Sequence, residues 1–448
     1  MSLGEILLIP GVTDPLTQLK SLLFKQGQAG GIWVPSLSPT MISSESFGTG
    51  VQTFLDLSGN GKNATQASSG SRPAWGRVPK SGRRNLQLHS EDLSNVLWTK
   101  TAVTLGSVQI VNGNVAVTEI VEDATTDQHR LQYLYSRVSG QQYTVSVYAK
   151  KGVGTRFLIL NFANFMGAEA GFNLDTGTTV NVTGSAAIES IGGGVYRCSV
   201  TGTAPSTGTA TGFLQIDDNG SSGSYAGDGV SSIFVGGVQF ETGSTATAYQ
   251  KVTTAFDITE SGQRDCYYLQ PDGVDDGMAT ASIDFSGTDK VTVFAAVRSF
   301  VDTPQGIIFE NPSTLPFDTF LSDNRATGKF GVDLRDVSNN QINGLSTTAR
   351  TKPINQILRV RFDLSETLAS NKIRLFENGS DVTAVGTVGT FTRTAFLNAA
   401  LHFFRRSNGT AHSNLQFFGG IVAGGNYPVS VEERVERILS RYTPGVSL

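Results

Sequence analysis

Residues 215–229 carry the side chains in this sequence that are best suited to binding a small polar ligand. The stretch reads QIDDNGSSGSYAGDG. Carboxylates and carboxamides can hydrogen-bond the hydroxyls of a sugar, and an aromatic ring can support its flat face. The candidate glycan-binding residues are Asp217, Asp218, Asn219, Tyr225 and Asp228. Their oxygen atoms could also hold Ca²⁺, and the simpler alternative is a solvated loop whose polar residues only satisfy its own turns.

The acidic residues show no spacing that is typical of catalysis. Glycoside hydrolysis uses a pair of carboxylates, but the E-x-D-x-x-E and E-x-D-x-E patterns of glucanases are absent. The nearest acidic group is Asp272, Asp275 and Asp276 in PDGVDD, where Asp-Gly indicates a turn. The sequence also lacks a G-x-S-x-G nucleophile elbow. We therefore expect no catalytic residues and no enzymatic activity.

A phosphate site is not expected either. Gly61-Lys62 lies in SGNGK, but Asp56 occupies the first glycine position of a phosphate loop and Asn63 follows the lysine. The Ser-Gly-Asn-Gly residues tolerate positive φ and instead predict a tight loop between two strands.

Cysteine and histidine usage predicts neither a metal site nor a cofactor. Cys198 and Cys266 show no C-x-x-C spacing, so we expect two buried free thiols. No H-E-x-x-H motif is present. The histidines are scattered, at His89, His129, His402 and His412.

Composition narrows the classes of partner. The net charge is only −4 and charged residues make up 16% of the chain, below the roughly 25% that is usual. A nucleic-acid binder would show a basic face, so no nucleic-acid partner is expected. No run of about 18 apolar residues predicts a membrane span. The start, MSLGEILLIPGVTDP, lacks the features of a secretory signal. We expect a protein made in a cytoplasm that either stays there or leaves by a route that needs no signal, such as particle assembly followed by lysis.

The chain predicts an all-β protein. Short strand-like stretches such as YTVSVYAKK, GVYRCSVTG, KVTVFAAVRSF and ILRVRFDL are separated by Gly, Ser and Asp clusters. Strands at this spacing, without helical periodicity between them, are typical of antiparallel sandwiches and jelly rolls. Asn-Gly pairs at 378–379 and 408–409 indicate hairpin turns.

Two helices flank the strands. Asp14 and Pro15 predict a helix start, and Gly27 predicts its end. The leucines of this helix need a surface to bury against, which is either the chain's own sandwich or another subunit. They are Leu16, Leu19, Leu22 and Leu23. At the other end, SVEERVERILSRYTPG predicts a helix with a capping box between Ser430 and Glu433.

Several phrases resemble those of bacteriophage virion and tail structural proteins. SGNGKNATQ…SRPAW, continued at LQPDGVDDGMATA, is similar to the start of laminin-G-like (concanavalin-A-like) sandwiches in that group. TDKVTVFAAVR and the stretch from RRSNGTAHSN to the C-terminal helix are similar to later parts of it. Between them, RRNLQLHSEDLSNVLWTK, GGGVYRCSVTGTA and VGGVQFETGSTATAYQ resemble carbohydrate-binding-module-like jelly rolls. The resemblance covers roughly residues 28–448.

The resemblance implies two parts, with residues 28–83 plus 257–448 as a discontinuous laminin-G-like sandwich and residues 84–256 as an inserted jelly roll. Surface loops accept such insertions when the ends of the insert lie close together. In the resembling family an Arg-Arg pair ends the matching strand, so the resemblance also implies a structural ion pair for Arg405-Arg406 rather than a ligand contact. Residues 1–27 lie outside the resemblance, and we expect them to be a docking segment whose particle-docking residues are Leu16, Leu19, Leu22 and Leu23.

The implied function is that of a non-enzymatic virion protein. We expect it to be tail-associated, as a fibre, spike or adaptor, and to bind host surface polysaccharide. The implied partners are other tail or capsid proteins and further copies of the chain, with a trimer expected by analogy with tail fibres. The alternatives are a capsid decoration or head-fibre protein, a module that binds only protein, and a glycan-degrading enzyme.

Overall fold

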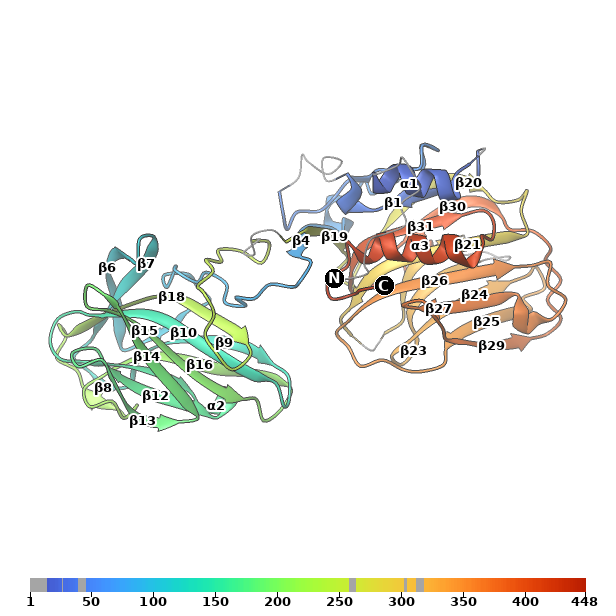
Figure 1. Ribbon diagram of the computed structural model, residues 1–448. Helices are drawn as coiled ribbons and strands as arrows, with labels where there is room; N and C mark the ends of the chain where they lie inside the picture. Colours follow the sequence, from blue (N-terminus) through green and yellow to red (C-terminus); the bar gives the residue numbers. More distant parts are fainter. Residues whose placement is uncertain (1–13, 26, 39–45, 258–262, 302–303, 312–317) are drawn as a thin grey trace. The chain divides into compact units, whose positions relative to one another are not determined.

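The computed structural model describes residues 14–448 except residues 26, 39–45, 258–262, 302–303 and 312–317. Contacts divide the chain into two compact units, Met1–Gly82 with Gln263–Leu448 (unit 1) and Arg83–Gly262 (unit 2) (Figure 1). Both consist mainly of antiparallel strands, which confirms the expected all-β fold class. The insert predicted over 84–256 falls inside the range of unit 2. Of the expected docking segment, residues 1–13 and 26 lie outside the described residues.

Unit 1 is built from two facing sheets, one of eight strands and one of nine. In spatial order, the first sheet contains β28 (Ser380–Asp381), β27 (Ile373–Glu377), β26 (Ile354–Asp363), β21 (Lys290–Ser299), β31 (Leu415–Ala423), β19 (Asp265–Gln270) and β4 (Ala74–Pro79), with β1 (Gly30–Trp33) also paired to β31. The second contains β2 (Thr53–Phe54), β3 (Ala64–Thr65), β20 (Met278–Asp284), β30 (Asn398–Phe403), β22 (Gly306–Asn311), β23 (Asp318–Ala326), β24 (Lys329–Arg335), β25 (Gln341–Ser346) and β29 (Thr383–Val388). Their inner faces share one apolar core, in which Trp33 meets Phe403 edge-on at 5.0 Å.

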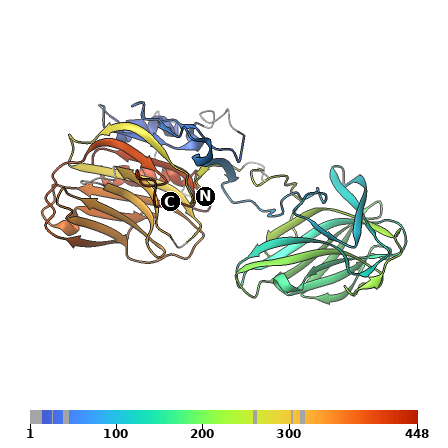
Figure 2. The same ribbon diagram turned by 180° about the vertical axis from the view of Figure 1, so that it is seen from behind.

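Unit 2 is a smaller sandwich of two six-stranded sheets (Figure 2). The first contains β14 (Ser185–Gly192), β15 (Val195–Thr203), β10 (Gln142–Lys151), β18 (Ser232–Thr242), β7 (Val115–Glu122) and β6 (Val103–Val111). The second contains β13 (Thr178–Thr183), β12 (Ala168–Asn173), β11 (Phe157–Phe162), β16 (Gly208–Asp217), β9 (His129–Arg137) and β5 (Thr99–Thr101). A short pair, β8 (Thr126–Asp127) with β17 (Tyr225–Ala226), and the one-turn helix α2 (Ala163–Met166) complete it. Alternate residues of both sheets fill a core that contains the free, buried Cys198.

The chain leaves and re-enters unit 1 on neighbouring strands. β4 pairs antiparallel with β19, from Ala74 opposite Gln270 to Pro79 opposite Asp265. Beyond the ladder, the Lys80 amide donates to the Arg264 carbonyl. The two ends between which unit 2 is inserted therefore lie side by side, which is the geometry that makes an insertion compatible with the host fold.

The SGNG loop is a structural loop, as its residues predict. It joins β2 to β3 around Asp56, whose carboxylate accepts from the amides of Ile32, Ser58 and Lys62 at 2.8–3.0 Å. Gly59 and Gly61 adopt φ of +101° and +66°. The Lys62 ammonium donates to the Ser282 carbonyl at 2.7 Å. The polar groups of this loop thus tie β1 to the second sheet.

The N-terminal helix α1 (Pro15–Leu23) begins as predicted, because the Asp14 carboxylate accepts from the Thr17 amide at 2.7 Å. Its leucines are only partly available for docking on a particle. Leu19 and Leu23 are buried within the chain, while Leu16 and Leu22 are half-buried. The Tyr427 hydroxyl donates to the Leu23 carbonyl, so the helix is anchored to the segment before α3. For Leu19 and Leu23, the expected role in docking is replaced by packing in unit 1.

The C-terminal helix α3 (Val429–Ser440) differs from the prediction at its start. Pro428 is the N-cap and no side chain caps the helix, so the expected capping box of Ser430 and Glu433 is wrong. The first-turn carboxylate that matters is Glu432, which is fully buried and pairs with Arg359 and Arg361 of β26. Figure 1 shows α3 lying across the sheet that contains β21, β26 and β31. The first turn of α3 is thus tied to β26 by a buried ion-pair cluster.

Replacing Leu19 by alanine should lower the free energy of unfolding of unit 1 by about 2–4 kcal/mol, because it opens a cavity under α1. Denaturant unfolding in a Trp98→Phe background would measure this, since Trp33 and Trp75 then report on unit 1 alone. The half-buried Leu16→Ala is the matched control and should cost clearly less. Equal losses for the two variants would contradict the packing of α1.

Candidate functional site

The candidate loop 215–229 folds back on unit 2, and many of its polar groups form hydrogen bonds within that unit. Asp217, at the end of β16, is 1% exposed. Its Oδ1 atom accepts from the amides of Asn219, Gly220 and Ser221, at 2.9, 2.5 and 3.1 Å. This carboxylate therefore holds the turn. Asp218 and Asn219 are exposed, and no hydrogen bond of their side chains is found among the described residues.

Tyr225 is not an open aromatic platform. It lies on β17, paired with Asp127 of β8. Its hydroxyl lies 2.5 Å from Glu122 Oε2 and 3.3 Å from the Ile216 carbonyl. Its ring meets the His129 imidazole edge-on, with centroids 4.6 Å apart. Burial and the neighbouring Glu122 raise the pKa of the phenol, so this group stays a protonated donor.

Asp228 is likewise engaged in the fold. Its Oδ1 atom accepts from the amides of Val230 and Ser231 at 2.8 and 2.7 Å, and Oδ2 accepts from the Ser231 hydroxyl at 2.6 Å. These hydrogen bonds hold the pKa of the carboxyl well below its usual range. Asp217, Tyr225 and Asp228 thus have structural partners, and the geometry does not support the glycan-binding role expected for them.

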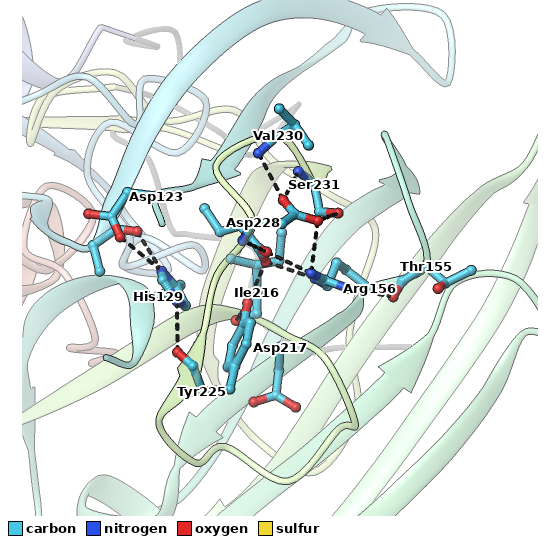
Figure 3. A network of polar contacts seen from close by, with 12 residues as sticks. Asp123, His129, Thr155, Arg156, Ile216, Asp217, Tyr225, Asp228, Val230 and Ser231 are labelled. Atoms are coloured by element: carbon cyan, nitrogen blue, oxygen red, sulfur yellow. Dashed lines mark hydrogen bonds and ion pairs between the residues drawn. The ribbon is translucent and has the colours of Figure 1, made fainter. Parts of the chain in front are cut away.

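The centre of this network is Glu122, which the sequence did not single out. The Arg156 guanidinium binds it bidentately, with Nε 2.8 Å from Oε2 and Nη2 2.6 Å from Oε1. The Asp228 amide adds a third donor at 2.9 Å. Figure 3 shows Arg156, Asp228 and Tyr225 converging on one point. Glu122, Arg156 and Tyr225 lie on separate strands or loops, so no local pattern could have revealed the cluster.

Electrostatics support a structural role for Glu122. Burial raises its pKa, but the hydrogen bonds from Arg156, Tyr225 and the Asp228 amide outweigh that effect and hold the pKa below its usual value. A carboxylate with both oxygens occupied by donors is a poor nucleophile or base. The network can clamp the 217–231 segment onto β7 and β11.

Free polar groups gather instead on the outer face of the sheet that contains β14 and β15, at the end away from β7. A groove of about 260 Å³ runs over β14, β15 and the segment after β18. It is lined by Ser185, Ala186, Ala187, Glu189, Arg197, Ser199, Thr201, Ser244, Thr245 and Ala246. The only sequence signal for it is the alternation of polar residues in SAAIES and YRCSVT, which is also what any solvated sheet face shows.

Arg197 is the one cation in the lining of the groove. Its Nη2 atom donates to the Ser146 hydroxyl at 3.0 Å and to the Thr247 carbonyl at 2.5 Å. Thr247 is in turn fixed by Glu241, whose carboxylate accepts from its amide at 2.9 Å and from its hydroxyl at 2.5 Å. The guanidinium is therefore held in place before any ligand arrives.

Unit 1 contains an acidic turn at PDGVDD. Carboxylate oxygens of Asp272, Asp275 and Asp276 all lie within 4.8 Å of one another. Asp272 accepts from the Val274 amide, Asp275 from the Ser71 hydroxyl, and Asp276 from the Asp272 amide, at 2.8–3.0 Å. Burial, reinforced by the two like charges, raises the pKa of Asp276 to about 6. These contacts account for the group as a turn, as its Asp-Gly pair predicts.

The arginine pair on the penultimate hairpin is structural. Arg406 pairs with the buried Glu310 at 3.1 Å, as expected. Arg405 donates to the Asp275 carbonyl at 3.1 Å and so braces the acidic turn.

No family model and no curated protein matches this chain. Among solved structures, a Trypanosoma rangeli sialidase is similar at 9% identity and a TM-score of 0.27, over 86% of this chain and 67% of that one. The tandem CBM22 domains of Paenibacillus barcinonensis Xyn10C match at 10% and 0.24, over 78% and 94%. Domains LG4-5 of the mouse laminin alpha1 chain match at 12% and 0.23, over 72% and 90%. At these identities and TM-scores, the similarities do not identify a function for this chain.

Replacing Glu122 by glutamine should lower the free energy of unfolding by about 2–4 kcal/mol at pH 7, because it leaves Arg156 without its buried partner. The depressed pKa also fixes a pH dependence. The stabilisation is present above the unfolded pKa of about 4.5 and is lost as the pH falls through the lower folded value. Scanning calorimetry between pH 7 and 3 should therefore show a steeper loss for the parent chain than for the variant. The exposed Glu189→Gln serves as control. If the parent chain and the Glu122→Gln variant lost stability equally as the pH falls, that result would contradict the clamp.

Replacing Asp276 by asparagine should instead raise the free energy of unfolding at neutral pH. Because the folded pKa of about 6 exceeds the unfolded value of 3.8, the folded chain loses stability as the pH rises through 6. Asparagine can still accept from the Asp272 amide but cannot ionise. Unfolding at pH 7.5 should therefore require about 1 kcal/mol more than in the parent, a value that includes screening by solvent. A variant that is instead less stable would show that the turn needs the carboxylate. The exposed Asp275→Asn is the comparison.

Proposed function

We propose that this chain is a non-enzymatic attachment protein of a bacteriophage particle, and that unit 2 binds host surface glycan. The observation that carries the proposal is the groove on the outer face of β14 and β15. It combines a held guanidinium with several hydroxyl groups, which suits hydrogen bonding to a sugar. The phage context rests on the sequence phrases that resemble virion proteins.

The proposal gives the two units different tasks. Unit 1, with α1, would dock on the particle as part of a tail fibre, spike or adaptor, through half-buried side chains such as Leu16 and Leu22. Unit 2 would contact the host. A groove of this size gives weak affinity per copy, so a homo-oligomer, for example a trimer, would strengthen attachment through effective concentration.

Two alternative functions would require different features of the chain. A capsid decoration or head-fibre protein would use the same sandwiches without a glycan. A glycan-degrading enzyme would need a pair of carboxylates facing a cleft. Glu122 is occupied by donors and the PDGVDD group is held in a turn, so neither favours that alternative.

We propose no role for calcium. None of the described helices is long and apolar enough to cross a membrane.

Binding of the labelled full-length chain to host cells tests the proposal. Mild periodate oxidation of the cells, which cleaves vicinal diols, should reduce bound protein to near background, whereas protease treatment should leave it largely intact. No new reducing ends should appear during the incubation. Loss after protease but not after periodate would indicate a protein receptor. Absence of binding, with incorporation into particles retained, would favour a decoration role.

A further inference from the structure

Arg197 carries hydrogen-bonding capacity that the described residues do not use. Only its Nη2 atom has acceptors. No acceptor for Nη1 is found in the described part of the chain, and this is the nitrogen left for a ligand, because Nε is buried and out of a ligand's reach. None of the described carboxylates lies within ion-pair distance of this guanidinium, in contrast to Arg156 in the same unit. A partly buried cation with unmet donors is a strong site for an anion.

The surroundings of Arg197 combine hydroxyl groups with small apolar side chains. Among the described residues, the hydroxyls of Ser185, Ser199, Ser244 and Thr245 form no hydrogen bond within the chain. Ala187 and Ala246 provide the methyl groups of the lining. Glu189 stands opposite Arg197 in the β14–β15 register but does not pair with it. The groove thus contains one fixed positive charge, one negative charge at Glu189, and free hydroxyl groups.

The groove is also organised in advance. The Tyr148 ring lies 5.7 Å from the Arg197 guanidinium carbon, and Ser146 and Thr247 fix its Nη2 atom. Glu241, itself 1% exposed, pins the 243–249 segment that forms one wall. Binding therefore need not order the arginine, which reduces its entropic cost.

We propose that the groove recognises the carboxylate of an acidic sugar, such as a uronic acid residue of a surface polysaccharide. The carboxylate accepts from Arg197, and the ring hydroxyls exchange hydrogen bonds with the serine and threonine hydroxyls. A volume of about 260 Å³ lies just under the range of drug-sized pockets, so it suits one sugar residue.

Other anionic ligands fit this surface less well. An acidic peptide would need aromatic or aliphatic anchor pockets, and the apolar groups among the described lining residues are only the small methyl groups of alanine and threonine. Nucleic acid would need a row of basic residues, whereas Arg197 is alone in the groove of a chain with net charge −4. This inference rests on the proposed glycan binding and narrows it to a class of sugar.

Calorimetric titration of the full-length chain with an oligogalacturonate trimer, and separately with its methyl ester, tests the inference. The ester keeps the rings and removes the charge. We expect the acid to bind about tenfold or more tightly than the ester, and Arg197→Gln to lose that difference. Glu189→Gln should bind the acid as well as or better than the parent. Arg130→Gln, an arginine of β9 on the other sheet, is the matched control and should leave binding unchanged.

The possible outcomes separate this inference from the proposed function. Equal binding of acid and ester, unaffected by Arg197→Gln, would overturn the acidic-sugar inference and leave glycan binding standing. Binding of neither ligand, together with periodate-insensitive attachment to cells, would overturn both. Displacement of the acid by a glutamate-rich peptide at equal concentration would assign the groove to a protein partner and overturn the inference.

Discussion

The antiparallel pairing of β4 with β19 is the contact on which the two-unit organisation depends. About 185 residues separate these strands in the chain, yet they are paired over six residues each and are joined by an Arg77–Asp265 ion pair at 3.3 Å. β19 also meets β31 at Leu269, so the ladder extends into the first sheet of unit 1. The entropy of closing a loop grows only slowly with its length. A folded insert whose ends lie one strand apart therefore disturbs unit 1 very little.

The same principle of local satisfaction explains the loops. In the SGNG loop, Asp56 gathers three backbone amides; in the 215–229 loop, Asp217 does the same. Buried polar groups must find partners, and short acidic side chains can accept from backbone amides close to them. Asp217 accepts from amides two to four residues ahead, whereas Asp56 accepts from amides two and six residues ahead and from Ile32 of β1. An acidic, glycine-rich loop is therefore as consistent with self-satisfaction as with ligand binding, and its composition alone cannot distinguish the two.

Unmet donors are the more informative feature. Arg156 and Arg197 lie in the same unit and are both partly buried, but Arg156 is neutralised by Glu122 while Arg197 has no carboxylate partner among the described residues. The first therefore stabilises the fold, and the second is left available to an external anion. The contrast depends on which strand lies next to which, since Glu122 belongs to β7 and the groove to β14 and β15.

The sequence by itself determined the class of fold, because strand periodicity, turn residues and the Asp14–Pro15 helix start are local signals that the structure follows. It also predicted that the PDGVDD and SGNG stretches are turns. It did not predict the start of α3, where Pro428 is the N-cap, nor the pairing of Glu432 with arginines of β26 more than 70 residues away in the chain. It also missed Glu122 and Arg197. Long-range strand pairing sets whether a polar side chain forms hydrogen bonds within the fold or stays free. Only the tertiary structure decided that.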